Sequence, residues 1–181
     1  DLPDPDPLRA AISVTDVTCF GFNNGMIDFG ASGGTGTYSY IWDNTMVSGT
    51  QVDHVAAGNY TLQILDAESC QYDTLVGVIE PEILRLTIDE RLTVFPFCPD
   101  WENGALAVRI TGGTPAYQYQ WTDYPEDTDS VLNDVRENFY TVTVIDRQGC
   151  ELDTTLKLVA QNNTCLGIPT AFTPNYDNAN D

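Results

Sequence analysis

The chain has 181 residues, of which 42% are hydrophobic and 10% aromatic, enough to bury one large core or two small ones. Its 27 acidic residues outnumber seven basic residues and give a net charge of −20. This charge argues against binding to nucleic acid or anionic membranes, because both need clustered Lys and Arg. No stretch approaches 18 consecutive apolar residues, so we expect no transmembrane helix and no direct membrane insertion.

The chain begins with an acidic, proline-rich segment, residues 1–7, in which Pro and Asp alternate. We expect this segment to be an extended linker from an upstream module. Two copies of one module follow, and we place them at residues 8–81 and 82–160. Cys19 and Cys98 lie 79 residues apart, and GNYTLQILDAESC aligns with NFYTVTVIDRQGC at an offset of 80. One loop residue explains the difference, so the sequence contains an internal duplication.

Each copy has the sequence pattern of β-structure. MIDFGAS and ALAVRIT alternate apolar and polar residues, as do YTLQIL and YTVTVI. Gly-Gly-Thr lies between the predicted strands, as turn chemistry requires. No segment has a convincing 3.6-residue period. The sequence therefore predicts an all-β fold: two tandem immunoglobulin-like antiparallel β-sandwich modules, followed by the truncated start of a further β domain.

Five cysteines follow the duplication. Each copy has one early and one late cysteine, so we expect Cys19 to pair with Cys70 and Cys98 with Cys150. A module of this size needs such a cross-link. A metal site is disfavoured, because no Cys-x-x-Cys pair or nearby histidine supports it. Cys165 is left over, and we expect its partner to lie outside this sequence.

Few residues could support catalysis. His54 is the only histidine and follows Asp53, but no nucleophile elbow is present. The second copy has Asp134 or a neighbour at this position, so we interpret His54 as a surface residue. The carboxylates show no distinctive pair for glycoside hydrolysis. We therefore expect no catalytic residues and no enzyme activity in these modules.

The tryptophans are candidates for ligand contact. Trp42 and Trp121 recur after Tyr-x-Tyr in both copies, which favours core packing over sugar binding. Trp101 occurs in one copy only, in a predicted loop. It is the better candidate for a residue that contacts a ligand.

The repeated residues resemble the SprB repeat, which is named for a giant surface adhesin of gliding bacteria. The shared frame is Cys, Asn-Gly, Gly-Gly-Thr, Tyr-x-Tyr-x-Trp, Gly-x-Tyr-Thr and Asp-x-x-x-Cys. The resemblance spans about residues 10–80 and 83–160 and is closer in the first copy. In the second copy, Asn138-Phe139 replaces the usual Gly-x before Tyr140.

Residues 161–181 look like a linker and the opening of a type B, gliding-motility-associated C-terminal sorting domain. The sequence IPTAFTPNYDNAND carries this resemblance, although Tyr176 and Asn178 replace two glycines of the usual form. The residues that match the sorting motif include Phe172, Thr173, Pro174, Asn175, Asp177, Asn180 and Asp181. The resemblance implies export to the extracellular cell surface, with the type IX secretion translocon and its outer-membrane accessory proteins as partners.

The Asn and Asp residues near the end of the chain form either a turn or a calcium loop. In the calcium alternative, Asn175, Asp177 and Asp181 supply oxygen ligands. The turn is favoured, because the EF-hand spacing and its glycine are absent. No other cofactor is expected.

Three hydroxyl side chains are candidates for O-glycosylation. The bacteria that carry these families often modify Ser or Thr in Asp-Ser/Thr-aliphatic triplets. Thr74 and Ser130 fit this pattern, and Thr154 fits it loosely. The alternative is that these are ordinary polar strand residues.

The first functional hypothesis is a non-catalytic stalk or adhesin module pair of a secreted cell-surface protein that acts in adhesion or gliding motility. The second is a module that binds a carbohydrate or surface polysaccharide through loops such as that around Trp101. The third is a C-terminal appendix of a secreted enzyme whose catalytic part lies upstream.

Overall fold

The structure is a computed structural model that describes residues 6–162 and 165. All of the named elements among these residues are β-strands, and the paired strands of the first repeat are antiparallel. The predicted all-β fold class is therefore confirmed. The expected start of a further β domain lies outside the described residues.

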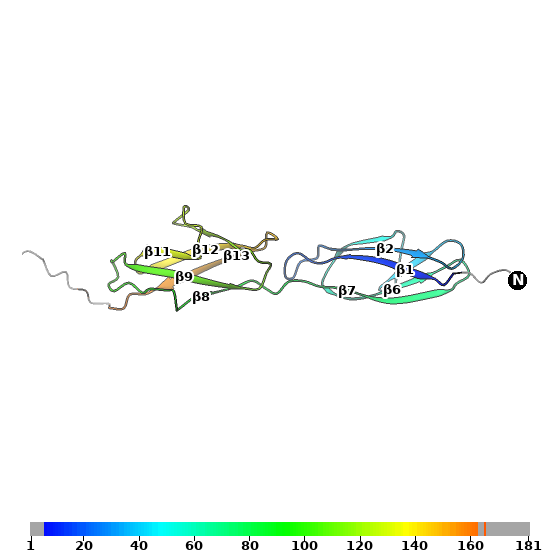
Figure 1. Ribbon diagram of the computed structural model, residues 1–181, viewed down its shortest axis with the longest axis horizontal. Helices are drawn as coiled ribbons and strands as arrows, with labels where there is room; N and C mark the ends of the chain where they lie inside the picture. The colour runs from blue at the N-terminus through cyan, green and yellow to red at the C-terminus, as the bar shows by residue number, and fades with distance from the viewer. Residues whose placement is uncertain (1–5, 163–164, 166–181) are drawn as a thin grey trace, which may run out of the picture. The chain divides into compact units, whose positions relative to one another are not determined.

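The first repeat is a sandwich of two sheets (Figure 1). One sheet has the order β1 (Arg9–Thr15), β2 (Gly25–Ser32), β5 (Gln51–Val55). The other has the order β4 (Thr45–Val47), β3 (Ser39–Trp42), β6 (Gly58–Leu65), β7 (Gln71–Val78). In β6, Leu62 and Ile64 are buried and their neighbours are less so, as expected for a strand with one face on the core.

The second repeat is built from the corresponding strands. One sheet has the order β11 (Val131–Val135), β9 (Gly104–Thr111), β8 (Arg85–Ile88). The other has the order β10 (Gln118–Trp121), β12 (Asn138–Ile145), β13 (Glu151–Leu158). The bounds of β2 and β9 differ by 79 residues and those of β6 and β12 by 80, so the structure confirms the internal repeat.

Aromatic residues fill the cores. Trp42 is 7% exposed and stacks on Tyr60 with 5.1 Å between ring centroids. Trp121 is 2% exposed, and its indole N–H donates to the carbonyl oxygen of Asp129 at 3.0 Å. These positions confirm that both tryptophans pack in cores rather than on the surface.

A tyrosine hydroxyl fixes the start of β6 and of β12. The Tyr60 hydroxyl donates to the carbonyl oxygen of Ala56 at 3.0 Å, and the Tyr140 hydroxyl donates to that of Arg136 at 2.8 Å. Each bond reaches back four residues, across the connection from the preceding strand. This bond explains the tyrosine of the Gly-x-Tyr-Thr motif, to which the sequence pattern alone assigns no role.

The chain divides into two compact units. The first comprises Asp1–Leu86, Ile110–Gln118 and Thr143–Asp153, and the second comprises Thr87–Arg109, Tyr119–Val142 and Thr154–Asp181. The first unit thus contains the first repeat together with two segments of the second. The boundaries at residues 8–81 and 82–160 describe the sequence repeat and stay a prediction.

The disulfides differ from those expected. Cys19 is bonded to Cys150 with 5.6 Å between Cα atoms, and Cys98 is bonded to Cys165 with 5.8 Å. Cys70 is a free, exposed thiol. The predicted pairs Cys19–Cys70 and Cys98–Cys150 are therefore wrong, and so is the expectation that Cys165 has no partner in the chain.

The length of the strands explains the correction. Cys19 lies before the start of β2, whereas Cys70 lies in the turn that contacts residues just beyond the end of β2. Eight extended residues span about 24 Å. A disulfide needs Cα atoms within about 7 Å, so the two cysteines of one repeat are too far apart to pair.

Candidate functional site at the ends of the repeats

The repeated motifs gather at the two ends of each repeat. We call one end the clasp end: residues 33–35 with 66–70 in the first repeat, and 112–114 with 146–150 in the second. We call the other the loop end: residues 17–25 in the first repeat and 96–104 in the second. The five cysteines all lie in or next to these ends.

One buried carboxylate ties the two turns of the first clasp end together. Asp66, 6% exposed, accepts hydrogen bonds from the backbone N–H groups of Thr35 at 2.9 Å, Glu68 at 3.0 Å and Cys70 at 2.8 Å. Burial acts to raise the pKa of Asp66, but these hydrogen bonds outweigh it and lower the pKa below 3.8. The carboxylate is therefore a structural group that is stable in its charged form.

The second clasp end has the same arrangement. Asp146 is 4% exposed and accepts from the N–H groups of Thr114 at 2.7 Å, Gln148 at 2.8 Å and Cys150 at 2.9 Å. The Asp-x-x-x-Cys motif is thus a clasp that positions its cysteine. The spacing of this motif aligns the two copies but does not by itself predict a hydrogen-bonding role. The recurrence of aspartate at the same place in both copies is the signal that could indicate one.

The Gly-Gly-Thr turn needs its first glycine for two reasons. Gly33 and Gly112 have φ angles of +75° and +76°, in the left-handed region that favours glycine. A Cβ atom on Gly33 would also clash with the carbonyl oxygen of Pro7, and one on Gly112 with that of Ile83. Pro7 and Ile83 belong to the segments that lead into β1 and β8.

These leading segments are held in the same way in both repeats. The N–H of Gly34 donates to the carbonyl oxygen of Asp6 at 2.7 Å, and the N–H of Gly113 donates to that of Glu82 at 2.7 Å. The segment before β1 therefore takes the place that the linker between the repeats takes before β8.

The loop end explains the Asn-Gly motif. The side-chain oxygen of Asn24 accepts from the N–H of Thr18 at 3.1 Å, and that of Asn103 accepts from the N–H of Phe97 at 3.3 Å. The following glycine is buried, and a Cβ on Gly104 would lie 2.7 Å from the carbonyl oxygen of Val135. Asparagine thus closes the cysteine loop, and glycine allows a close backbone approach.

His54 lies in a bulge of β5. The register with β2 shifts at this residue, which is exposed and has a φ of +58°. Asp134 occupies the corresponding bulge of β11 with a φ of +53°. The position requires a left-handed residue rather than an imidazole, in agreement with the interpretation of His54 as a surface residue.

The Cys19–Cys150 disulfide joins the loop end of the first repeat to the clasp end of the second. Both cysteines lie in the first compact unit. A groove of about 440 Å³ flanks the bond, and it is lined by Phe20 and Phe22 from the loop end and by Leu152 from β13. The side chain of Glu80, in the linker, accepts from the N–H of Gly21 at 2.5 Å. This end-to-end junction has both covalent and polar contacts.

The second loop end is linked to the segment that leaves β13. Cys98 is bonded to Cys165, and the N–H of Asn162 donates to the carbonyl oxygen of Phe97 at 3.1 Å. The ring of Phe97 lies 5.7 Å from that of Trp101, which is 53% exposed. Trp101 has the sequence position in the second repeat that Phe22 has in the first. Phe22 lines the groove described above. Its role as a ligand contact stays a prediction.

The remaining predicted sites are not brought together. Thr74 in β7, Thr154 in β13 and Ser130 before β11 are all half-buried, and their glycosylation stays a prediction. The predicted calcium ligands Asn175, Asp177 and Asp181 lie outside the described residues. So do the other sorting-motif residues, namely Phe172, Thr173, Pro174 and Asn180.

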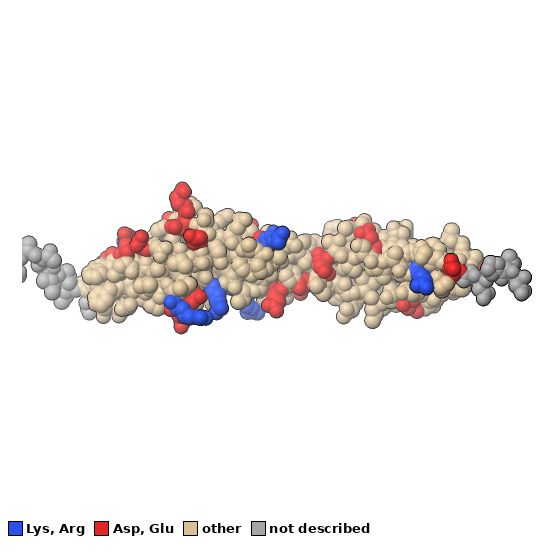
Figure 2. Space-filling model, viewed as in Figure 1, with Lys and Arg blue, Asp and Glu red and all other residues tan. Residues whose placement is uncertain are grey.

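The acidic residues are dispersed. On the face drawn in Figure 2, they form separate small groups on both repeats, and basic side chains are few. Within residues 6–162 and 165, no three His, Cys, Asp or Glu side chains form a cluster suited to a metal ion. No helix in this part of the chain is long and apolar enough to cross a membrane.

The fold and the repeated ends define a class: all-β proteins built from tandem immunoglobulin-like antiparallel sandwiches. Within this class, the family model of the SprB repeat matches residues 11–47 and 96–124. The first match runs from β1 to β4, and the second runs from the loop end to just beyond β10. No curated protein sequence matches the chain.

Several solved structures are similar in part. The N-terminal eight Ig domains of Down Syndrome Cell Adhesion Molecule match with 13% identity and a TM-score of 0.41, over 86% of this chain and 25% of that one. A C-terminal intimin fragment, in complex with the intimin-binding domain of its receptor, matches with 13% identity and a TM-score of 0.40, over 82% and 63%. Fibronectin(III)-like modules of Clostridium thermocellum CbhA match with 9% identity and a TM-score of 0.33, over 83% and 94%. The chain spans less than two thirds of the first two.

Proposed function

We propose that the two repeats are non-catalytic stalk modules of a secreted cell-surface protein that acts in adhesion or gliding motility. The observation that carries this proposal is the Cys19–Cys150 bond, which joins the loop end of one repeat to the clasp end of the next. Under tension along the chain, this bond is a covalent path that bypasses the 131 residues between its cysteines, so the strands between them are not pulled apart. The SprB matches support the surface location, because this repeat is typical of cell-surface proteins.

The acidic surface fits the same role. With a net charge of −20, neighbouring copies repel one another and resist pairing through their sheet edges. The disulfides fit an oxidising compartment outside the cytoplasm. Export through the type IX secretion system, with its translocon and outer-membrane accessory proteins, is the route that the terminal sequence motif favours.

Deletion in the native host tests export and stalk function separately. Removal of the chain from Gly167 to the natural C-terminus is expected to abolish surface display, measured by antibody labelling of intact cells. The two repeats should still fold and resist protease in the cell envelope. The matched control removes the first repeat, residues 8–81, and is expected to keep display while weakening adhesion or gliding. Normal display after the first deletion would contradict the export route.

A second candidate function, binding of a surface polysaccharide, is favoured by one observation. The exposed rings of Phe97 and Trp101 lie together at the second loop end, and exposed aromatic side chains are typical of sugar-binding surfaces. Glycan-array binding by the chain, with Trp101→Ala compared with Phe22→Ala, distinguishes the two functions. Sugar binding that only Trp101→Ala abolishes would favour the second function. The stalk proposal expects no glycan-specific binding.

A further inference from the structure

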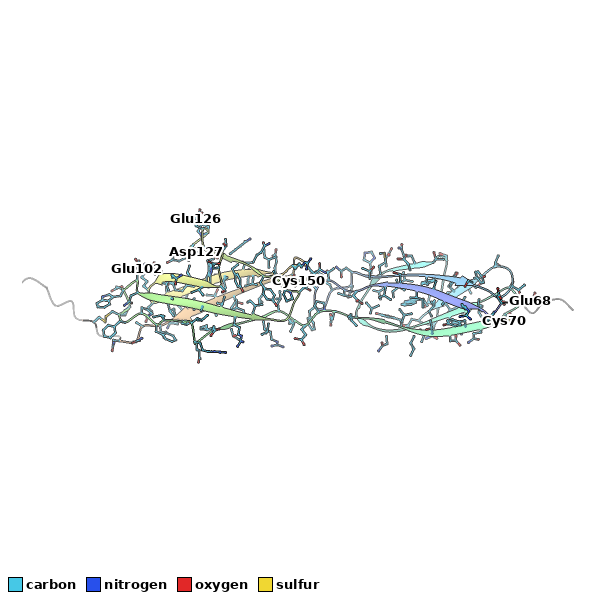
Figure 3. All side chains as sticks on the ribbon, viewed as in Figure 1. Glu68, Cys70, Glu102, Glu126, Asp127 and Cys150 are labelled. Carbon is cyan, nitrogen blue, oxygen red and sulfur yellow. A yellow bond between two sulfur atoms is a disulfide. The ribbon has the colours of Figure 1, made fainter. Side chains whose placement is uncertain are left out.

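The strongest unexplained feature is the thiol of Cys70. The structure bonds the other four cysteines, whereas Cys70 is free and exposed in the turn between β6 and β7, next to Glu68 (Figure 3). Its counterpart in the second repeat is Cys150, which is bonded to Cys19 and is 8% exposed. The same position of the repeat therefore forms a disulfide in one copy and lacks a partner in the other.

The two positions have the same local geometry. The N–H of Cys70 donates to Asp66 at 2.8 Å, and that of Cys150 donates to Asp146 at 2.9 Å. The residues before them, Ser69 and Gly149, both have left-handed φ angles, of +67° and +82°. The clasp therefore holds the Cys70 backbone in the conformation in which Cys150 forms its disulfide.

A second observation comes from the segment that leads into the first repeat. Asp6 bonds to Gly34 as Glu82 of the inter-repeat linker bonds to Gly113, with 2.7 Å in each case. The sequence agrees, because DPDPLR at residues 4–9 matches EPEILR at residues 80–85 in its acidic, proline, leucine and arginine positions. The segment that contacts the first clasp end thus resembles the linker before the second repeat, and that linker follows another repeat.

We infer that Cys70 forms a disulfide with the early cysteine of a preceding SprB-type repeat, at the same junction that Cys150 makes with Cys19. The partner is a loop end of the Cys19 type, with an aromatic residue three positions after its cysteine, as Phe22 follows Cys19. Its cysteine lies at a separation close to the 131 residues between Cys19 and Cys150. In the receiving repeat, half-buried Tyr72 takes the position of Leu152 beside the bond.

The bond forms by thiol–disulfide exchange with a disulfide-bearing oxidoreductase. The Cys70 thiolate attacks one sulfur of the oxidoreductase disulfide and releases the other as a thiolate. The thiolate of the partner cysteine then attacks the Cys70 sulfur, which forms the new bond and releases the oxidoreductase as a dithiol. Two protons and two electrons leave the pair of cysteines, and the electrons reduce the oxidoreductase.

The environment of Cys70 suits a structural bond. The negative charge of Asp66, together with desolvation, raises the pKa of the Cys70 thiol above 9.0. A thiol with a raised pKa has little thiolate at neutral pH, so it exchanges slowly with the oxidoreductase and is unsuited to rapid catalytic turnover or metal binding. The disulfide of its counterpart, Cys150, therefore indicates the role of Cys70 better than its pKa does.

Peptide mapping of the full-length native protein tests the inference. Free thiols are blocked with iodoacetamide before digestion without reductant, and cross-linked peptides are identified by mass spectrometry. The expected result is a cross-link from the Cys70 peptide to a cysteine close to 131 residues upstream. A Cys70 blocked by iodoacetamide, a Cys70 bonded within its own repeat or to a second copy of the chain, or no cysteine near that separation would overturn the inference.

Two serine variants of the full-length protein sharpen the result. Cys70→Ser is expected to release one upstream cysteine for labelling, whereas the matched variant Cys150→Ser is expected to release Cys19. An unchanged labelling pattern in Cys70→Ser would also overturn the inference. Both readouts are peptide masses and do not depend on surface display. They therefore test the Cys70 disulfide even if the proposed stalk function is wrong.

Discussion

The two clasp ends have the same hydrogen bonds but different cysteine chemistry. Asp66 and Asp146 each accept three backbone N–H groups, yet Cys150 is bonded and Cys70 is free. The clasp therefore forms without the disulfide. The bonded cysteines are thus not cross-links within one sandwich. Each of the two bonds joins a repeat to the next repeat or to the segment after its last strand.

The two loop ends lead to a related conclusion. Cys19 is bonded to a cysteine of the next repeat, whereas Cys98 is bonded to Cys165 in the segment after β13. In both cases the partner lies later in the chain and outside the repeat's own strands.

The largest effect is expected from removal of the junction disulfide. Cys19→Ser combined with Cys150→Ser frees a loop of 131 residues, whose closure stabilises the folded state by about 4 to 5 kcal/mol in the chain-entropy model. Denaturant unfolding of oxidised protein measures this loss. Cys70→Ser is the control and should leave the isolated chain's unfolding free energy unchanged, because its thiol is free. Equal losses in both variants would contradict the assigned pairing.

The next effect concerns the first glycine of the clasp turn. Gly112→Ala is expected to cost about 2 to 4 kcal/mol, because alanine is strained at a φ of +76° and its Cβ meets the Ile83 carbonyl oxygen. Gly30→Ala in β2 is the matched control, since a Cβ there has no heavy atom within 4 Å. Its effect should stay within about 1 kcal/mol. Thermal unfolding of the two variants checks the difference.

A smaller effect is expected at the tyrosine hydroxyls. Tyr140→Phe removes the hydrogen bond to the Arg136 carbonyl oxygen and should lower the unfolding free energy by about 1 kcal/mol. Tyr60→Phe removes the corresponding bond in the first repeat and should have a similar effect. Denaturant unfolding that shows a loss in one repeat only would mean that the two repeats differ in this feature.

The smallest effect is a pH dependence. The pKa of Asp66 is lowered below 3.8 in the folded state, so its charged form favours folding. This contribution is complete above about pH 4 and is lost as the pH falls through the folded-state pKa. Urea unfolding between about pH 2.5 and 7 should therefore be less pH-dependent in Asp66→Asn than in the parent. If the unfolding free energy depended on pH equally in both proteins, the Asp66 hydrogen bonds would not stabilise the charged carboxylate.

Much of the fold follows from the sequence. Period-two alternation placed the strands, and the offsets of 79 and 80 residues placed the two copies. The burial of Trp42 and Trp121 followed from their recurrence. The disulfides could not be derived in this way, because equal spacing fits a bond within a repeat and a bond between repeats equally well. Only the arrangement of the strands reveals that Cys19 and Cys70 lie at opposite ends of a sandwich.

The roles of the motif residues were only partly predictable. Asp66 and Tyr60 recur in the second copy as Asp146 and Tyr140, which indicated importance but not the bonds that they make. Their partners are backbone groups, which every residue has, so residue identities do not predict which groups are bonded. The first glycine of each Gly-Gly-Thr turn is required because a carbonyl oxygen lies close to it. Sequence patterns do not predict this contact either.

Single-molecule stretching of the oxidised chain from its two ends tests whether Cys19 and Cys150 are joined. With Cys19 bonded to Cys150, the covalent path bypasses 131 residues, so full unfolding should extend the chain by about 45 nm less than in reduced protein. We predict a shortening of about 45 nm that falls to about 23 nm in Cys19→Ser, because the Cys98–Cys165 bond then still bypasses 67 residues. Two separate shortenings, each of about 17 nm for a bond between cysteines of one repeat, would contradict the end-to-end junction.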